Sequence, residues 1–192
     1  MNEPSRSPPP EKPPPEKPPS RRSRLRELAG RLSHKSMPRG ELAALRRLDP
    51  ARPSEPALWR LLFAVLPEEE VPASEALVRR WALAVKGMAL MAPLTRQESG
   101  VSGAGAALVE IGYSEARLAR LLAARGEAFE VLFLRLCRQL AAGGQRVNWG
   151  DLGLLALSGA EETEAAEGHR LALARAYYHS LHKSQAVKEP AA

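Results

Sequence analysis

The chain has 192 residues and a formal net charge of +6, with 28 Lys and Arg residues against 22 Asp and Glu residues. This length allows one domain, or two small ones, with a buried core. The basic residues are mostly Arg, whose planar guanidinium group binds phosphate, so the composition favours an anionic partner. A single cysteine excludes an internal disulfide and suits a reducing cytoplasm. No apolar run reaches the roughly 18–20 residues of a membrane span, so a cytoplasmic protein without membrane contact is expected.

Residues 1–20 contain the sequence Pro-Pro-Pro-Glu-Lys twice in succession. A segment of this composition cannot form a packed core, so we expect a disordered, partly polyproline tail. A ligand for a proline-binding domain is the alternative to a solubilising tail. Residues 21–37 follow as a basic amphipathic helix and linker, with Leu25, Leu28 and Leu32 on one face. This helix could contact nucleic acid, a membrane surface or neither.

Apolar residues at helical spacing predict three helices after the linker, at residues 39–48, 55–66 and 74–91. Ser54 and Ser74 are expected to cap the second and third helices, because serine hydroxyls accept hydrogen bonds from the first unpaired amides. The second helix is expected to bury five apolar side chains. These are Leu58, Trp59, Leu62, Phe63 and Leu66. The third helix is apolar around most of its axis, which predicts a central position in the fold.

Further helices are expected after a polar loop at residues 95–100. They cover residues 104–111, 114–125, 127–142 and 149–157, and a last helix starts near residue 161 and frays by residue 188. Ser114 and Asn148 precede two of these helices as N-terminal caps. No segment shows the alternating pattern of a strand, so the predicted class is all-α.

The predicted organisation is a helical bundle of two packed lobes between tails. The N-terminal lobe covers residues 39–93 and the C-terminal lobe covers residues 103–183, because the polar loop separates two sets of apolar helices. The tail at residues 1–20 and the short tail at residues 184–192 are expected to be disordered.

The helices at residues 114–125 and 127–142, hinged at Gly126, carry the most informative pattern. Each has one apolar stripe, formed by Leu118, Leu121 and Leu122 on the first helix and by Phe129, Leu132, Phe133, Leu136 and Leu140 on the second. Two pairs of arginines lie away from these stripes at 100° per residue, namely Arg117 with Arg120 and Arg135 with Arg138. Outward guanidinium groups of this kind predict a phosphate-binding surface. Solvated helix faces are the alternative interpretation.

No catalytic constellation is evident in the sequence. His179 and His182 are three residues apart on a helix, but no carboxylate or cysteine partner is near, so no metal site and no cofactor are expected. Gly103 and Gly105 lack the Gly-Lys-Ser/Thr of a phosphate loop, so close helix packing explains them better. A binding or scaffolding protein is therefore predicted in preference to an enzyme.

Several stretches, taken in order and spacing, resemble one known family. They are RGELAALRRL at 39–48, LWRLLFAV at 58–65, SGVSGAGAALVEIGYSEARLARLLAARGE at 99–127, VNWGDLGLLAL at 147–157 and the pair Tyr177-Tyr178. The chain resembles the CasB family, the small subunit of the type I-E Cascade surveillance complex of bacterial CRISPR immunity. One departure is Ala106, where family members often carry a basic residue, so a contact at that position would be missing here.

The resemblance implies a non-catalytic subunit that holds the backbones of guide RNA and target DNA and stabilises the displaced single strand. The implied partners are these nucleic acids, the other Cascade subunits and a second copy of the chain. The binding role is carried onto six arginines in the matched stretches. They are Arg47, Arg117, Arg120, Arg125, Arg135 and Arg138. Base pairing would read the sequence, so backbone contacts would suffice.

A helix-turn-helix transcription regulator is the alternative from another class. Such a protein is also basic and helical, but its recognition helix carries several polar side chains that read bases. The segment Glu115-Ala116-Arg117 is the only candidate for such a helix start, and it carries few of these side chains. A nucleic-acid-processing enzyme is a more remote alternative.

Overall fold

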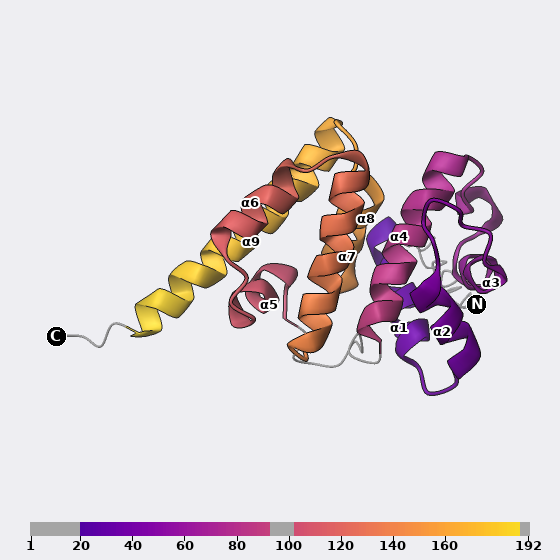
Figure 1. The fold of residues 1–192 in the computed structure, drawn as a ribbon, viewed down its shortest axis with the longest axis horizontal. Helices are drawn as coiled ribbons and strands as arrows, with labels where there is room; N and C mark the ends of the chain where they lie inside the picture. The colour runs from indigo at the N-terminus through magenta and orange to yellow at the C-terminus, as the bar shows by residue number, and fades with distance from the viewer. Residues whose placement is uncertain (1–19, 93–101, 189–192) are drawn as a thin grey trace, which may run out of the picture.

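A computed structural model describes residues 20–92 and 102–188 of the chain (Figure 1). These residues form α-helices and one short 3-10 turn, η1 (Glu68–Glu70), which confirms the predicted all-α class. In chain order the helices are α1 (Arg21–Ser33), α2 (Arg39–Arg47), α3 (Pro56–Val65), α4 (Glu75–Met91), α5 (Ala104–Glu110), α6 (Glu115–Ala123), α7 (Gly126–Ala142), α8 (Trp149–Ser158) and α9 (Glu164–Lys188). An isolated β-bridge joins Ser102 to Val147. The predicted tail covers residues 1–20, of which residues 1–19 lie outside the described residues and Ser20 caps α1. The predicted loop at residues 95–100 also lies outside the described residues.

Side-chain caps start several of the helices where the sequence predicted. The hydroxyls of Ser74 and Ser114 accept backbone N–H bonds at the starts of α4 and α6, and the Asn148 side chain does the same for α8. The predicted cap at Ser54 is wrong by one residue, because the Glu55 carboxylate caps α3. Pro56 explains the shift, since proline lacks an N–H and suits the first position inside a helix.

Helix α4 lies at the centre of the bundle, as predicted, and packs against α1, α2, α7 and α8. Gly87 permits this close approach. A methyl group at Gly87 would lie 2.9 Å from Trp149 Cη2 of α8 and 3.0 Å from Cys137 Sγ of α7. Cys137 is fully buried there, and burial raises the pKa of its thiol. The lone cysteine is therefore a core residue.

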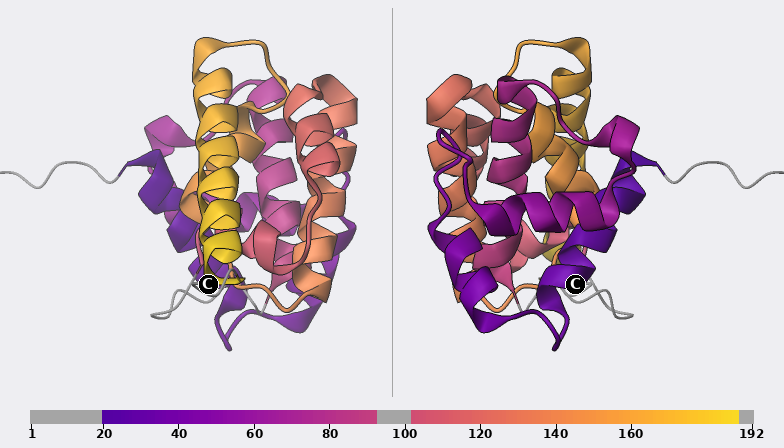
Figure 2. Two further views of the ribbon diagram at one scale, coloured as in Figure 1. Left: turned by 90° about the vertical axis from the view of Figure 1, so that its left-hand side faces the viewer. Right: turned by 90° about the vertical axis from the view of Figure 1, so that its right-hand side faces the viewer.

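The remaining helices close the core from the outside. Helix α1 packs on α8, and its Leu25, Leu28 and Leu32 are buried. Helix α5 packs on α9 with Gly105 directly against the α9 backbone, so the interpretation of this glycine as a packing residue is confirmed. Figures 1 and 2 show α6 and α9 at one end of the molecule and α2 and α3 at the opposite end.

One continuous cluster of buried side chains runs through both predicted lobes. The basic helix at the N-terminus also contributes to it, which the sequence did not predict. The boundary between the lobes falls on residues 93–101, outside the described residues, so the division into two lobes stays a prediction. Helix α9 continues through Lys188, and residues 184–188 are therefore helical where the sequence placed a tail.

Phe63, which was predicted to face inward, is exposed instead, and two large side chains of α9 are exposed as well. Phe63 is 61% exposed, because α3 buries the stripe that contains Leu58, Leu62 and Val65. Leu171 is 68% exposed and Tyr178 is 48% exposed, because α9 turns Leu173 and Tyr177 inward. The Tyr177 hydroxyl donates to the Tyr113 carbonyl oxygen at 2.6 Å, which fixes α9 against the α5–α6 connection.

Candidate nucleic-acid-binding surface

Helices α6 and α7 are antiparallel, with two hollows between them. The first hollow is lined by Arg120, Ala123 and Ala124 of the α6 side and by Glu127, Ala128, Val131 and Leu132 of α7. The second is lined by Tyr113, Arg117, Gln139, Ala142 and neighbouring residues. We call the two hollows together the α6–α7 groove. Leu132, predicted to be a core residue, is partly buried and lines this groove.

The α6–α7 groove exists because each helix buries only one stripe. Leu118 and Leu121 of α6 are 1% and 0% exposed. Phe129, Phe133 and Leu136 of α7 are fully buried. Gly126 adopts a φ of +52°, a left-handed conformation that glycine takes without strain, and so starts α7 directly after α6 ends. The side chains between the two buried stripes are left on the groove.

Three of the predicted arginines come together along the α6–α7 groove. Arg117 and Arg120 line it directly. Arg135 lies on the same stripe of α7, because it follows Leu132 by three residues and precedes Gln139 by four. All three side chains are exposed, and none forms an ion pair or a side-chain hydrogen bond within the described residues.

The charges of two of these arginines affect the pKa of Tyr113. Burial raises the pKa of the Tyr113 phenol, and the positive charges of Arg117 and Arg120 act in the opposite direction. Tyr113 is 6% exposed, so the two guanidinium groups lie at the edge of the core. The hollow that Tyr113 lines therefore has the guanidinium group of Arg117 and the carboxylate of Glu110 on its lining.

Arg138 is exposed on α7 and lines neither hollow of the α6–α7 groove. It is about 60° around the helix axis from Arg135. Burial and the charge of Arg138 both lower the pKa of Lys86, whose ammonium group donates to the Leu48 carbonyl oxygen at 2.6 Å. Arg47 is exposed at the end of α2, in a separate hollow with Asp49. The charge of Arg138 therefore acts on Lys86 of α4. Arg138 was among the predicted arginines, whereas Lys86 was not predicted as part of the basic surface.

Arg125 differs from the other predicted arginines, because its guanidinium group already has partners. Nη1 donates to the carbonyl oxygens of Leu122 at 2.9 Å and Ala124 at 3.0 Å. Nη2 lies 2.6 Å from the Glu167 carboxylate of α9. A phosphate would have to compete with Glu167 for this side chain.

Glu167 also binds Arg170, which is only 3% exposed. The Arg170 Nη2 atom donates to the Glu161 carbonyl oxygen at 2.7 Å and to the Gly159 carbonyl oxygen. Arg80 of α4 in turn forms an ion pair with the Glu161 carboxylate. We call the set Arg80, Arg125, Glu161, Glu167 and Arg170 the α9 ion-pair network. It connects α4, the α6–α7 turn and the start of α9.

Most arginines of α1 form ion pairs or hydrogen bonds with other side chains of the protein. Arg22 pairs with Asp151 at 2.8 Å, and Arg31 pairs with Glu27 at 3.3 Å. Arg26 donates through Nε to the Asn148 side-chain oxygen at 3.1 Å. Together with the buried leucines, these contacts make α1 a packing helix of the bundle.

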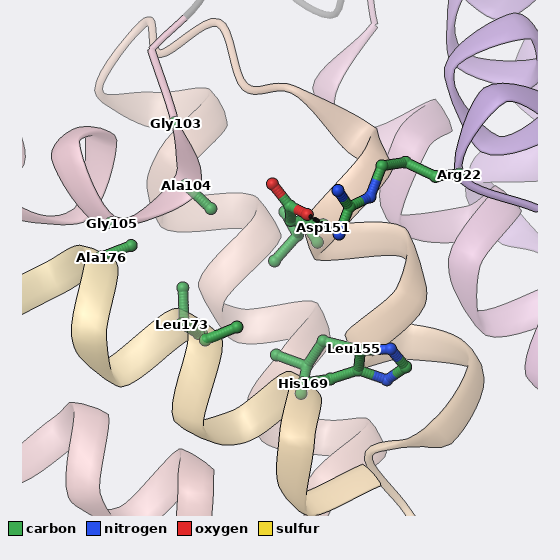
Figure 3. Close-up of a pocket in the computed structure, with 11 residues that line it drawn as sticks. Arg22, Gly103, Ala104, Gly105, Asp151, Leu155, His169, Leu173 and Ala176 are labelled. Atoms are coloured by element: carbon green, nitrogen blue, oxygen red, sulfur yellow. Dashed lines mark ion pairs between the residues drawn. The ribbon is translucent and has the colours of Figure 1, made fainter. Parts of the chain in front are cut away.

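An apolar pocket of about 150 Å³ lies among α1, α5, α8 and α9 (Figure 3). Leu155, Leu173 and Ala176 line it, and the Arg22–Asp151 ion pair lies at its side. His169 also lines it, but the Nδ1 atom of this ring is hydrogen-bonded to the Ser158 hydroxyl at 2.8 Å. The pocket has no nucleophile and base aimed at one point.

Two classes of site are not found in the described part of the chain. Residues 20–92 and 102–188 contain no group of three or more His, Cys, Asp and Glu side chains that could hold a metal ion. His179 and His182 are both exposed on α9. Within the same ranges, none of the helices combines the length and the apolar character of a membrane span.

The described residues form an all-α protein in which Arg117 and Arg120 line one groove and form no ion pair with another described residue. The family model of the CRISPR-associated protein Cse2 matches residues 41–178, well over half of the chain. The chain therefore belongs to the Cse2 family, also called CasB, which is the small subunit of the type I-E Cascade complex. This match confirms the resemblance of the sequence stretches. No curated protein and no solved structure matches the chain.

Proposed function

We propose that this Cascade subunit is a non-catalytic clamp for nucleic-acid backbones. It holds guide RNA and target DNA, and it stabilises the displaced single strand, in a cytoplasmic complex that contains a second copy of the chain and the other Cascade subunits. The observation that carries the proposal is that Arg117 and Arg120 line this groove, and that Arg135 lies on the same stripe of α7 as the lining residues Leu132 and Gln139. All three are exposed and form no ion pair among the described residues.

The proposed ligand is phosphate because of the chemistry of the groove. Guanidinium groups bind phosphate oxygens through charge and a planar fork of donors, whereas reading bases needs positioned Asn, Gln or Arg side chains at a groove of the duplex. The lining of the α6–α7 groove has two amide side chains, Gln139 and Gln145, and it also includes the carboxylates of Glu110 and Glu127. In an RNA-guided complex base pairing reads the sequence, so a backbone clamp is sufficient.

We assign a different role to each of the other three predicted arginines. Arg138, near Lys86, extends the basic surface from the groove towards α4. Arg47 provides a separate contact at the end of α2. Arg125 stays a predicted contact, but the Glu167 carboxylate lowers its availability to phosphate.

The proposal is tested by assembling Cascade with a variant subunit in which Arg117, Arg120 and Arg135 are all replaced by Ala. A matched control replaces Arg31, Arg60 and Arg79, which are also exposed but are paired with Glu27, Glu41 and Glu75. Both variants lose three positive charges. We expect both to assemble, and only the groove variant to bind target DNA weakly and to leave the displaced strand open to a single-strand nuclease.

Two results would contradict the proposal. One is normal target binding and normal strand protection in the complex that contains the groove variant. The other is an equal loss of binding with the control variant, because that would show an effect of net charge without a role for the groove.

A further inference from the structure

The C-terminal half of α9 carries a basic surface that the proposed clamp does not use. Residues 168–188 contain no Asp or Glu. The exposed basic side chains of this segment are Arg175, His179, His182 and Lys183. At about 100° per residue, the first three lie within about 60° of one another, on the side of α9 opposite the buried Tyr177. None of the four forms an ion pair or a side-chain hydrogen bond with another described residue.

An exposed tyrosine borders this basic surface. Tyr178 is 48% exposed and lies about 40° around the helix axis from His182. Its ring meets that of Tyr177 edge to face, with the two centroids 5.3 Å apart and an interplanar angle of 88°. Hydrogen bonding to the Glu115 carboxylate raises the pKa of the Tyr178 phenol, so the hydroxyl lies at the start of α6. These contacts hold the ring in place while much of it stays open to solvent. We call Tyr178 and the four basic side chains the α9 outer face.

The α9 outer face is joined to the end of the α6–α7 groove by contacts of two tyrosines. The Tyr177 hydroxyl donates to the carbonyl oxygen of Tyr113, which lines the second hollow together with Arg117. The partner of Tyr178, Glu115, lies between Tyr113 and Arg117 in the sequence. Both tyrosines of α9 therefore contact the short segment that leads from the hollow into α6. Figure 1 shows the last turns of α9 projecting beyond α5 and α6, so the α9 outer face extends away from the groove.

The chemistry of the α9 outer face fits a strand of unpaired nucleotides. Arg175 and Lys183 carry positive charges that attract phosphate, and the imidazoles of His179 and His182 provide further polar groups. An exposed aromatic ring beside such groups is a platform on which a base can stack, and stacking is tolerant of sequence because every base has a π-face. A duplex hides the faces of its bases inside the helix. Stacking on Tyr178 is therefore open to unpaired bases and closed to paired ones.

We propose that the α9 outer face is a stacking site for an unpaired base, and that Tyr178 gives this subunit a preference for single strands over duplex. The inference rests on the proposed clamp, because the α6–α7 groove supplies the phosphate contacts that bring a strand to α9. The groove holds the backbone of any strand, whereas the Tyr178 ring retains only a strand whose bases are free. Arg175 and Lys183 bind the phosphates on either side of the stacked base.

Strands with and without bases separate the two kinds of contact. The full chain is titrated with a thymine homopolymer and with an abasic strand of equal length, and binding is followed by fluorescence anisotropy of the labelled strand. Tyr178→Ala should weaken binding of the thymine strand by about 5- to 140-fold, which corresponds to about 1–3 kcal/mol for one stacked base. It should leave binding of the abasic strand unchanged. Tyr178→Phe should bind both strands like the wild-type chain, because it keeps the ring and removes only the hydroxyl.

Phe63→Ala is the matched control, since it removes a ring that is 61% exposed on α3, at the opposite end of the molecule (Figure 1). It should change the affinity for neither strand. Unchanged binding of the thymine strand by Tyr178→Ala, or an equal loss for the thymine and abasic strands, would overturn the stacking site. Failure of the clamp itself gives a different result, in which the groove variant binds both strands as tightly as the wild-type chain.

Discussion

The α6–α7 groove and the α9 ion-pair network contain the same residue type in opposite situations. In the groove, Arg117, Arg120 and Arg135 are exposed and lack an acidic partner among the described residues. In the network, Arg125 and Arg170 share the carboxylate of Glu167. Both regions flank the α6–α7 turn. The difference is that Glu167 of α9 forms ion pairs with Arg125 and Arg170, whereas among the described residues no carboxylate lies within ion-pair distance of Arg117, Arg120 or Arg135.

The largest expected effect comes from truncating a buried side chain of α6. Leu118 is 1% exposed under α6, so Leu118→Ala should leave a cavity and lower the free energy of unfolding by about 2–5 kcal/mol. A urea titration followed by circular dichroism measures this change. The exposed Leu171 is the control, and Leu171→Ala should change the stability by less than about 0.5 kcal/mol. Equal effects of the two substitutions would contradict the assigned packing of α6.

An intermediate effect is expected in the α9 ion-pair network. Arg170→Ala leaves the Gly159 and Glu161 carbonyl oxygens without their donor and should destabilise the protein by about 1–3 kcal/mol. Affinity for nucleic acid, measured on folded protein at low temperature, should stay unchanged. A stable Arg170→Ala variant with weakened binding would place Arg170 with the groove arginines.

The smallest expected effect comes from removing the acidic partner of Arg125, which then resembles the arginines of the groove. Glu167→Gln removes the charge that holds Arg125, while the Gln side chain can still accept a hydrogen bond from Arg170. Arg125 then becomes available to phosphate, and the slope of log affinity against log salt should steepen by about 0.7–0.9. Stability should fall by no more than about 1 kcal/mol, because Glu167 is half exposed. An unchanged slope would mean that Arg125 does not face the bound strand.

The sequence was sufficient for the class of fold and for most helix boundaries. Periodic leucines, together with caps such as Ser74 and Ser114, specify a helix locally, and local signals survive in the folded chain. The inward face of α3 was not predictable in this way. Its residues are apolar around most of the helix, so the pattern fits more than one buried stripe, and the packing against α1 and α2 selects the one that exposes Phe63.

The candidate site was predictable only in part, for a similar reason. Helical spacing placed Arg117, Arg120 and Arg135 outside the core. The structure brings Arg117 and Arg120 to the lining of the α6–α7 groove and leaves Arg135 exposed on α7. The ion pair between Arg125 and Glu167 joins residues 42 positions apart, so no local pattern could indicate it. The approach of Lys86 to Arg138 likewise depends on how α4 packs on α7.

The most direct test of the clamp is a salt titration of the free subunit with single strands. The variant in which Arg117, Arg120 and Arg135 are replaced by Ala is compared with the wild-type chain and with the Arg31, Arg60 and Arg79 control. Each protein is titrated with two unrelated strands at several salt concentrations. Backbone binding predicts that the groove variant loses affinity equally for both strands, and that the log–log slope flattens by about 0.7 for each lost contact. An unchanged affinity and slope, or a loss confined to one of the two strands, would contradict phosphate binding by the α6–α7 groove.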